Sequence, residues 1–176
     1  MKKPMITDER LNFVYGEHQA MAAYRDLRQS GGFLDFAREF MHCDNSRVAR
    51  NALWVLTKAT DEELSALQVA YNELIDLAMS TEHSAVRRLS LNIVIRLKMD
   101  VDDLRTDFLD FCLEHAVDVN ELPGIQTLCM KLAFRMCSFY PELMDEFMST
   151  VESMRIEFYK PAVRCIRTRI LNGKYK

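Results

Sequence analysis

Apolar residues recur along this chain at helical spacing, and one such stretch is found four times. Ser90 and Ile93 lie four and seven residues after Val86, and Leu97 follows four residues later, which makes one face of an α-helix. The residue that begins this face, called the anchor below, returns every 38 or 39 residues, at Val48, Val86, Ile125 and Val163. A fixed period of this length predicts a stacked array of helix pairs.

Each anchored helix follows another helix, and short turns join the two. Two residues before each anchor stands a residue suited to a helix start, at Ser46, Ser84, Pro123 and Pro161. A further helix is expected over residues 7–29, and we interpret it as a cap, because the terminal units of arrays close an open end. The sequence therefore predicts an all-α fold of about four antiparallel helix pairs plus an N-terminal capping helix.

We expect a single domain over residues 1–176, since no low-complexity segment interrupts the chain. Its predicted parts are the N-terminal cap at 1–32 and four repeats at 33–58, 60–98, 100–137 and 138–172. The last five residues, 172–176, are expected to fray.

Charged residues take fixed places around the anchors. An acidic residue lies four before three of them, at Asp44, Glu82 and Glu121. An arginine lies one or two after the anchor at Arg50, Arg87, Arg88 and Arg164. Together with the period, these features resemble the HEAT-repeat (armadillo-like) family of α-solenoids over roughly residues 33–171.

The resemblance implies a right-handed α-α superhelix in which the second helix of each pair lines a concave side. It also implies that the acids and arginines form a ladder between repeats. The third repeat departs from the family pattern, because Gln126 and Thr127 stand where arginines are expected. In the last repeat Arg167 occupies a position that is small elsewhere, which suggests a cap with a polar outer side.

Charge divides between the two helices of each pair. The anchored segments 46–58, 84–98, 123–137 and 160–176 hold fifteen Lys or Arg and no Asp or Glu. The alternating segments 60–82, 100–121 and 138–158 hold nineteen acids and two arginines. The net charge of −3 hides this separation. Combined with the resemblance, it predicts a basic inner groove and an acidic back.

Helix dipoles explain part of this sorting, since acids favour helix starts and bases favour helix ends. They do not explain Arg50, Arg87 and Arg88, which lie in first turns where a cation is unfavourable. We therefore expect these arginines to meet an anionic group, either inside the protein or on a partner.

Residues two and six past each anchor point away from the apolar face, and residues one and ten past it flank them. From these positions we predict a partner-binding groove made of Arg50, Trp54, Arg87, Arg88, Asn92, Arg96, Lys131, Arg135, Arg164 and Arg169. Trp54 has two interpretations. It is an anchoring residue for a partner, or it packs under the N-terminal helix at the open end of the array.

The sequence carries no catalytic or metal-binding motif. It lacks a glycine-rich phosphate loop, a nucleophile elbow and an H-E-x-x-H pair. Its histidines are scattered, at His18, His42, His83 and His115. We therefore expect a protein that is not an enzyme and has no metal site and no cofactor.

Five cysteines without a C-x-x-C pair predict free thiols and a reducing, cytoplasmic location. The N-terminal residues lack the apolar run of a secretory signal. No segment approaches the roughly 18–20 apolar residues that cross a bilayer, so no membrane association is expected.

These features favour a non-catalytic interaction scaffold that binds an acidic peptide or protein surface in the basic groove. Binding to a nucleic-acid backbone is one alternative, because some HEAT-like proteins are DNA glycosylases for alkylated bases. Against it stand a pI near 5.8 and the lack of that family's aromatic–aspartate–arginine site. The other alternative is a homodimer in which the basic side of one copy meets the acidic back of another.

Overall fold

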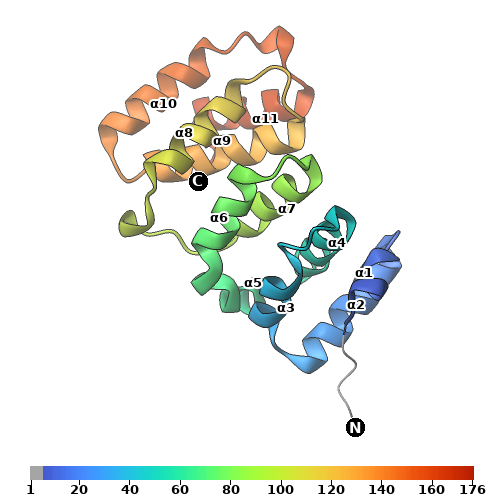
Figure 1. Ribbon diagram of the computed structural model, residues 1–176. Coiled ribbons are helices and arrows are strands. Elements are labelled where there is room, and N and C mark those ends of the chain that lie inside the picture. The colour runs from blue at the N-terminus through green and yellow to red at the C-terminus, as the bar shows by residue number, and fades with distance from the viewer. Residues whose placement is uncertain (1–5) are drawn as a thin grey trace. The chain divides into compact units, whose positions relative to one another are not determined.

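The computed structural model describes residues 6–176, and within that range every regular element is a helix (Figure 1). The predicted all-α fold is confirmed. The first five residues of the predicted cap lie outside the described range. The chain forms two compact units, residues 1–98 (unit 1) and 99–176 (unit 2), which are described separately here. A single domain over residues 1–176 stays a prediction.

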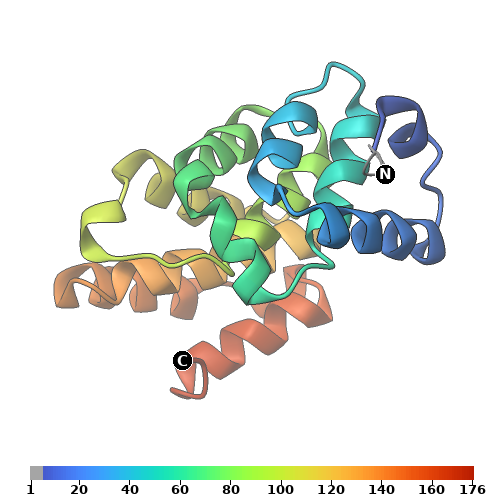
Figure 2. The ribbon, with the colours of Figure 1, turned by 90° about the horizontal axis from the view of Figure 1, so that it is seen from below.

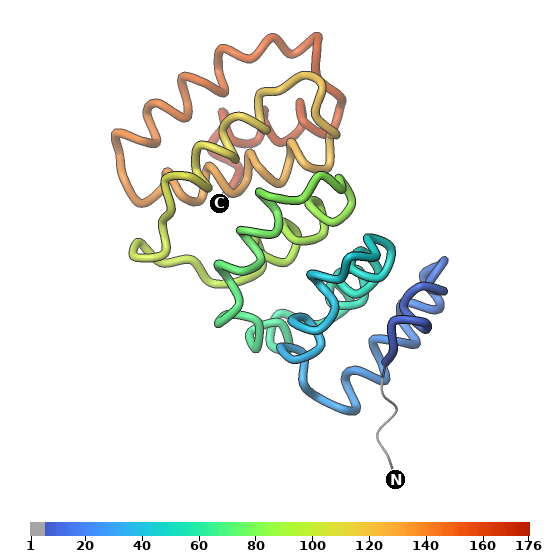
Figure 3. The backbone as a smooth tube through the Cα atoms, viewed as in Figure 1, coloured from blue at the N-terminus to red at the C-terminus, as the bar shows by residue number. Residues whose placement is uncertain are grey.

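Unit 1 contains the predicted cap and the first two repeats. Its elements are α1 (Asp8–Asn12), α2 (Glu17–Ser30), α3 (Phe33–Phe40), α4 (Ser46–Leu56), α5 (Asp61–Leu64), the 3-10 helix η1 (Ser65–Ala70), α6 (Tyr71–Ser80) and α7 (Ser84–Val94). Helix α3 packs on α4, and α6 packs on α7. Figure 3 shows α6 and α7 side by side and antiparallel. The second helices α4 and α7 also contact each other.

Unit 2 contains the last two repeats. Its elements are the 3-10 helix η2 (Val101–Asp103), α8 (Thr106–Val117), α9 (Pro123–Cys137), α10 (Pro141–Ser153), the 3-10 helix η3 (Ile156–Phe158) and α11 (Pro161–Leu171). The pairs are α8 with α9 and α10 with α11, and the second helices α9 and α11 contact each other. In Figure 2, α11 lies along an edge of unit 2 and leads to the C-terminus.

The anchors are the reason for this pairing. All four are buried: Val48, Val86, Ile125 and Val163. Burying such a side chain contributes roughly 1.5–3 kcal/mol, so each second helix is held to its unit by the face that the sequence predicts. Helices α9 and α11 have the bounds expected from their initial prolines.

The single helix predicted over residues 7–29 is wrong, because α1 and α2 are separate helices. The side chain of Asn51, which is fully buried in α4, donates to the carbonyls of Leu11 (2.6 Å) and Val14 (3.0 Å). A carbonyl inside a continuous helix accepts from the amide four residues later, and here these two accept from Asn51 instead. A tertiary contact therefore holds the break open.

Two other first helices are shorter than expected. The segment that begins at Thr60 has a capping box between Thr60 and Glu63, but a 3-10 helix separates α5 from α6. The segment that begins at Asp100 forms only η2 before α8 starts. In both, the acidic start signals a helix correctly and the helical hydrogen-bond pattern changes after one turn.

Candidate binding surface

In three of the four repeats, the side chain one past the anchor donates a hydrogen bond to a backbone carbonyl of the chain that precedes its helix, whereas the first repeat has Ala49 there. Arg87 donates from Nε to the carbonyl of Ala78 (3.0 Å) and from Nη2 to that of Thr81, at the C-terminal end of α6. Carbonyls at a helix C-terminus lack intrahelical donors and carry partial negative charge. These carbonyls are the anionic group that the sequence analysis expected for Arg87, and they lie inside the protein.

The same position has the same role in unit 2. Gln126, which is buried, donates from Nε2 to the carbonyl of Asp118 at the end of α8 (2.6 Å). Arg164 donates from Nε to the carbonyl of Tyr159 (2.9 Å). Gln126 departs from the family pattern, but its neutral side chain takes the place of an arginine here. The hydrogen bond to the carbonyl needs only an N–H donor, which an amide supplies.

The cations ten past the anchor in unit 1 are also used internally. Lys58 pairs with Glu17 at the start of α2 (2.7 Å), and Arg96 pairs with Asp61 at the start of α5 (2.8 Å). Arg96 also donates to the carbonyls of Thr57 and Ala59 beyond the end of α4. These positions link one layer of unit 1 to the next.

Arg50 and Trp54 lie on α4, and each is half-buried. Both Nε and Nη2 of Arg50 donate to Oδ1 of Asn51 (3.0 and 2.7 Å). Arg50 therefore supports the Asn51 clamp, by which we mean the bonds from Asn51 to the carbonyls of Leu11 and Val14 at the α1–α2 break. The ammonium of Lys58 lies 5.6 Å from the centre of the Trp54 ring. Neither interpretation of Trp54 is decided by these contacts.

The remaining predicted residues point outward from their units. Arg88 and Arg169 are exposed, Asn92, Lys131 and Arg135 are half-buried, and none lies in a core. Through their side chains, Arg88, Lys131 and Arg169 make no ion pair or hydrogen bond with any residue in 6–176. These three are the unsatisfied cations of the predicted set.

Contacts between second helices gather the predicted residues within each unit. In unit 1, α4 contacts α7, so the helices that carry Arg50 and Arg88 are neighbours. In unit 2, α9 contacts α11, so the helices that carry Lys131 and Arg169 are neighbours. A continuous groove over all four second helices stays a prediction.

The C-terminal turn contributes residues that the sequence reasoning missed. The predicted fraying of residues 172–176 is wrong, because the amide of Lys174 donates to the carbonyl of Arg169 (2.8 Å) and that of Gly173 to Ile170 (3.0 Å). Gly173 has φ +64°, so this is a Schellman motif. The Asn172-Gly173 pair directly after the helix is the sequence feature from which this turn could have been predicted.

This turn returns Tyr175 to the protein. Its ring packs edge-on against Phe134, with ring centres 5.1 Å apart. Burial raises the pKa of Tyr175, and the charges of Arg135 and Arg169 oppose that rise. Both arginines therefore lie near one phenol, and the end of α11 is a basic cluster.

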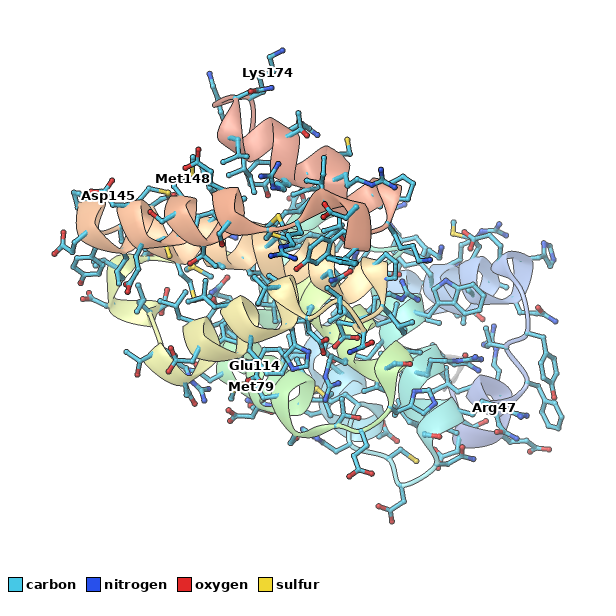
Figure 4. The ribbon with its side chains drawn as sticks, turned by 90° about the horizontal axis from the view of Figure 1, so that it is seen from above. Arg47, Met79, Glu114, Asp145, Met148 and Lys174 are labelled. Carbon is cyan, nitrogen blue, oxygen red and sulfur yellow. The ribbon has the colours of Figure 1, made fainter. Side chains whose placement is uncertain are left out.

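An open groove of about 490 Å³, called the α11 groove below, runs along α11. Its lining consists of uncharged or basic residues: Pro161, Arg164, Cys165, Thr168, Arg169, Asn172 and Lys174. In Figure 4, Lys174 extends from the end of α11, whereas Asp145 and Met148 extend from α10. No acidic residue lines the groove.

The paired helices, buried anchors and repeating caps agree with the comparison with known families, in which the model of the HEAT repeat domain matches residues 7–174. The chain belongs to the HEAT repeat family. Comparison with curated proteins and with solved structures gave no match. HEAT repeats generally serve as protein-interaction scaffolds, and the family is typically non-catalytic.

Three further features of this HEAT repeat protein concern metal binding, the contacts of His115 and the lengths of its apolar helices. No group of three or more His, Cys, Asp or Glu in the described range could hold a metal ion. His115 instead binds Glu121 through Nδ1 and contacts the ring of Phe111. No helix within residues 6–176 is long and apolar enough to span a membrane.

Proposed function

We propose that this HEAT repeat protein is a non-catalytic interaction module that binds an acidic peptide or an acidic protein surface through the outward cations of its second helices. The observation that carries the proposal is that Arg88, Lys131 and Arg169 have no internal partner among the described residues. Complementary charge across an interface speeds association and selects partners.

Their surroundings support an acidic partner. The second-helix segments carry no Asp or Glu, so a carboxylate that approaches Arg88 or Arg169 meets no like charge on the same helix. The first helices are acidic, which disfavours a long polyanion that would extend past the basic side. A short acidic segment avoids that repulsion.

We also propose a cytoplasmic location. All five cysteines are free, and three of them, Cys112, Cys129 and Cys137, are buried. Burial raises the pKa of the Cys137 thiol to about 11, which keeps it protonated and unreactive. Free thiols are typical of a reducing compartment.

The test uses three purified variants, Arg88→Glu in unit 1, Arg169→Glu in unit 2, and Arg25→Glu as the control. Arg25 is an exposed cation of α2 that is outside the second helices and has no side-chain partner in the described range. Partners captured from the source cell are then made recombinantly, and their affinities are measured by calorimetry. We expect an acidic segment whose affinity falls in one or both second-helix variants and is unchanged in the control.

Two results would contradict the proposal. One is equal affinity of all three variants for every captured partner. The other is tight binding of arbitrary duplex DNA at low salt, lost steeply as salt rises, which would identify a nucleic-acid backbone as the ligand.

A further inference from the structure

The α11 groove lies opposite the face by which α11 packs into unit 2. The packing face consists of Val163, Ile166 and Ile170, all buried. Successive residues of a helix turn by about 100°, so Pro161, Cys165, Thr168 and Asn172 fall on the opposite side, in one line. These short uncharged side chains form the floor of the groove.

Cations lie on both sides of this floor. The same helical geometry places Arg164 on one flank and Arg169 on the other, and Lys174 lies at the C-terminal end. Only Nε of Arg164 is engaged by the described part of the chain, and Arg169 is exposed. Because residues 160–176 contain no acid, charge complementarity requires an anionic occupant.

The shape of the groove specifies the form of that occupant. Helix α11 has eleven residues, which at 1.5 Å per residue gives about 16 Å, or three turns. A floor of small residues between longer side chains allows another helix to approach closely, as when ridges pack into grooves. The occupant that fits is a helix of about three turns with carboxylates on both flanks.

We propose that the α11 groove binds an acidic amphipathic helix of a partner protein, with the small or apolar face of that helix on Cys165 and Thr168 and its carboxylates against Arg164 and Arg169. This inference rests on the proposed function and names its partner and its place. A symmetric dimer through two α11 helices is disfavoured, because it would bring like charges together. A second copy that offers its acidic back is tested by light scattering.

Cys165 gives the proposal a local readout. It lies on the floor of the groove and is exposed, whereas Cys43 lies on unit 1 and is half-buried. The rate at which N-ethylmaleimide alkylates each cysteine, followed by mass spectrometry, reports whether the groove is covered. Cys43 serves as the internal reference in the same sample.

The probe is a 16-residue capped peptide that forms a helix with one alanine-rich face between two rows of glutamate. A matched peptide of the same composition carries two central prolines. The proteins are wild type, Arg169→Glu/Lys174→Glu and Arg25→Glu. Arg164 is left intact because its bond to Tyr159 is structural. Affinity is measured by fluorescence anisotropy, and light scattering follows the oligomeric state.

We expect the helical peptide to bind wild type and Arg25→Glu equally and to slow alkylation of Cys165 several-fold, with Cys43 unchanged. The double variant should bind about tenfold more weakly, as two exposed charge reversals imply. The proline peptide should bind far more weakly than the helical one.

Other outcomes overturn the proposal in distinct ways. Arg88→Glu is measured in the same way: if the helical peptide binds wild type and Arg88→Glu abolishes binding while Cys165 stays reactive, the proposed function holds and the α11 groove is the wrong site. Equal affinity of the two peptides would mean that the occupant is not a helix. A dimer that the double variant dissociates would make the occupant a second copy. If no acidic peptide binds wild type, both proposals fail.

Discussion

The two units treat their cations differently. In unit 1 several basic residues meet carboxylates from other helices, at Arg38–Glu73, Lys58–Glu17, Arg96–Asp61 and Arg28–Glu63, whereas Arg88 has no described side-chain partner. In unit 2 the arginines of α11 bind carbonyls or, in the described range, nothing: Arg164 and Arg167 cap backbone, and Arg169 is unpaired. The comparison shows that each of these four paired cations in unit 1 reaches the acidic first turn of a helix.

The reason lies in the layering of unit 1. A cation at the end of a second helix reaches the acidic first turn of another helix, as Lys58 reaches Glu17 of the cap and Arg96 reaches Asp61 of its own repeat. These pairs serve the fold. Within residues 6–176 no acidic residue lines the α11 groove, which is why we propose that its charges meet a partner.

The largest effect is expected at the clamp of unit 1. Asn51→Leu removes the side-chain donor of the Leu11 and Val14 carbonyls and the acceptor of Arg50, so that the Leu11 carbonyl keeps the bond from the amide of Val14 and the Val14 carbonyl loses its bond to Asn51. We expect a loss of about 3 kcal/mol in the free energy of unfolding, measured with urea. The control is Asn92→Leu, an outward asparagine of α7, which should change stability by less than about 0.5 kcal/mol. Equal losses would show that the Asn51 clamp is not what holds the α1–α2 break.

A smaller difference in the free energy of unfolding is expected between variants of two arginines, Arg88 in α7 and Arg96 in the turn after it. Arg96→Ala loses the ion pair with Asp61 and two carbonyl contacts, so we expect about 1–2 kcal/mol of destabilisation. Arg88→Ala should cost less than about 0.5 kcal/mol, because Arg88 is exposed and has no described side-chain partner. If Arg88→Ala is the more destabilising variant in urea, the division of cations into structural and free ones is wrong.

The smallest effect is a pH dependence in unit 1. The pKa of Glu63 is lowered, first by the backbone N–H of Thr60 (2.9 Å) and then by Tyr24 and Arg28. Because the pKa of Glu63 is lower in the folded protein than in the unfolded chain, its ionised carboxylate stabilises the fold above about pH 4, the ordinary carboxyl pKa. This stabilisation is lost as the pH falls through the folded-state pKa.

Glu63→Gln should therefore destabilise the protein most near pH 7, and the difference from wild type should shrink below about pH 4. Urea unfolding across this range measures it. The neighbouring Glu62→Gln, whose exposed side chain has no described partner, should show no such trend. A gap between Glu63→Gln and wild type that stays constant with pH would contradict the role of the ionised carboxylate.

Much of the fold was predictable from sequence because the anchors are apolar, regularly spaced and buried. The breaks within helices were not predictable, because they depend on tertiary contacts: Asn51 lies some forty residues from the carbonyls that it binds. Periodicity within one helix contains no information about such a partner.

The outward cations of the candidate surface were predicted only in part. Helical geometry identified which side chains point outward, including Arg88 and Arg169, but it could not distinguish an outward cation from one that bends back to a carbonyl. Arg87 and Arg164 do the latter. Lys174 was missed because its position depends on a turn formed after the helix ends.

Two arginines of α11, two residues apart, have different roles: Arg167 serves the fold, and by our proposal Arg169 serves a partner. Arg167 donates to the carbonyls of Val151 and Glu152 at the end of α10, both at 2.8 Å, whereas Arg169 has no described side-chain partner. The direct test measures both unfolding free energy and affinity for the acidic helical peptide in Arg167→Ala and Arg169→Ala. We predict that Arg167→Ala loses about 1 kcal/mol of stability with little change in affinity, and that Arg169→Ala loses affinity with unchanged stability. The reverse assignment, or a loss of both properties in both variants, would contradict the account.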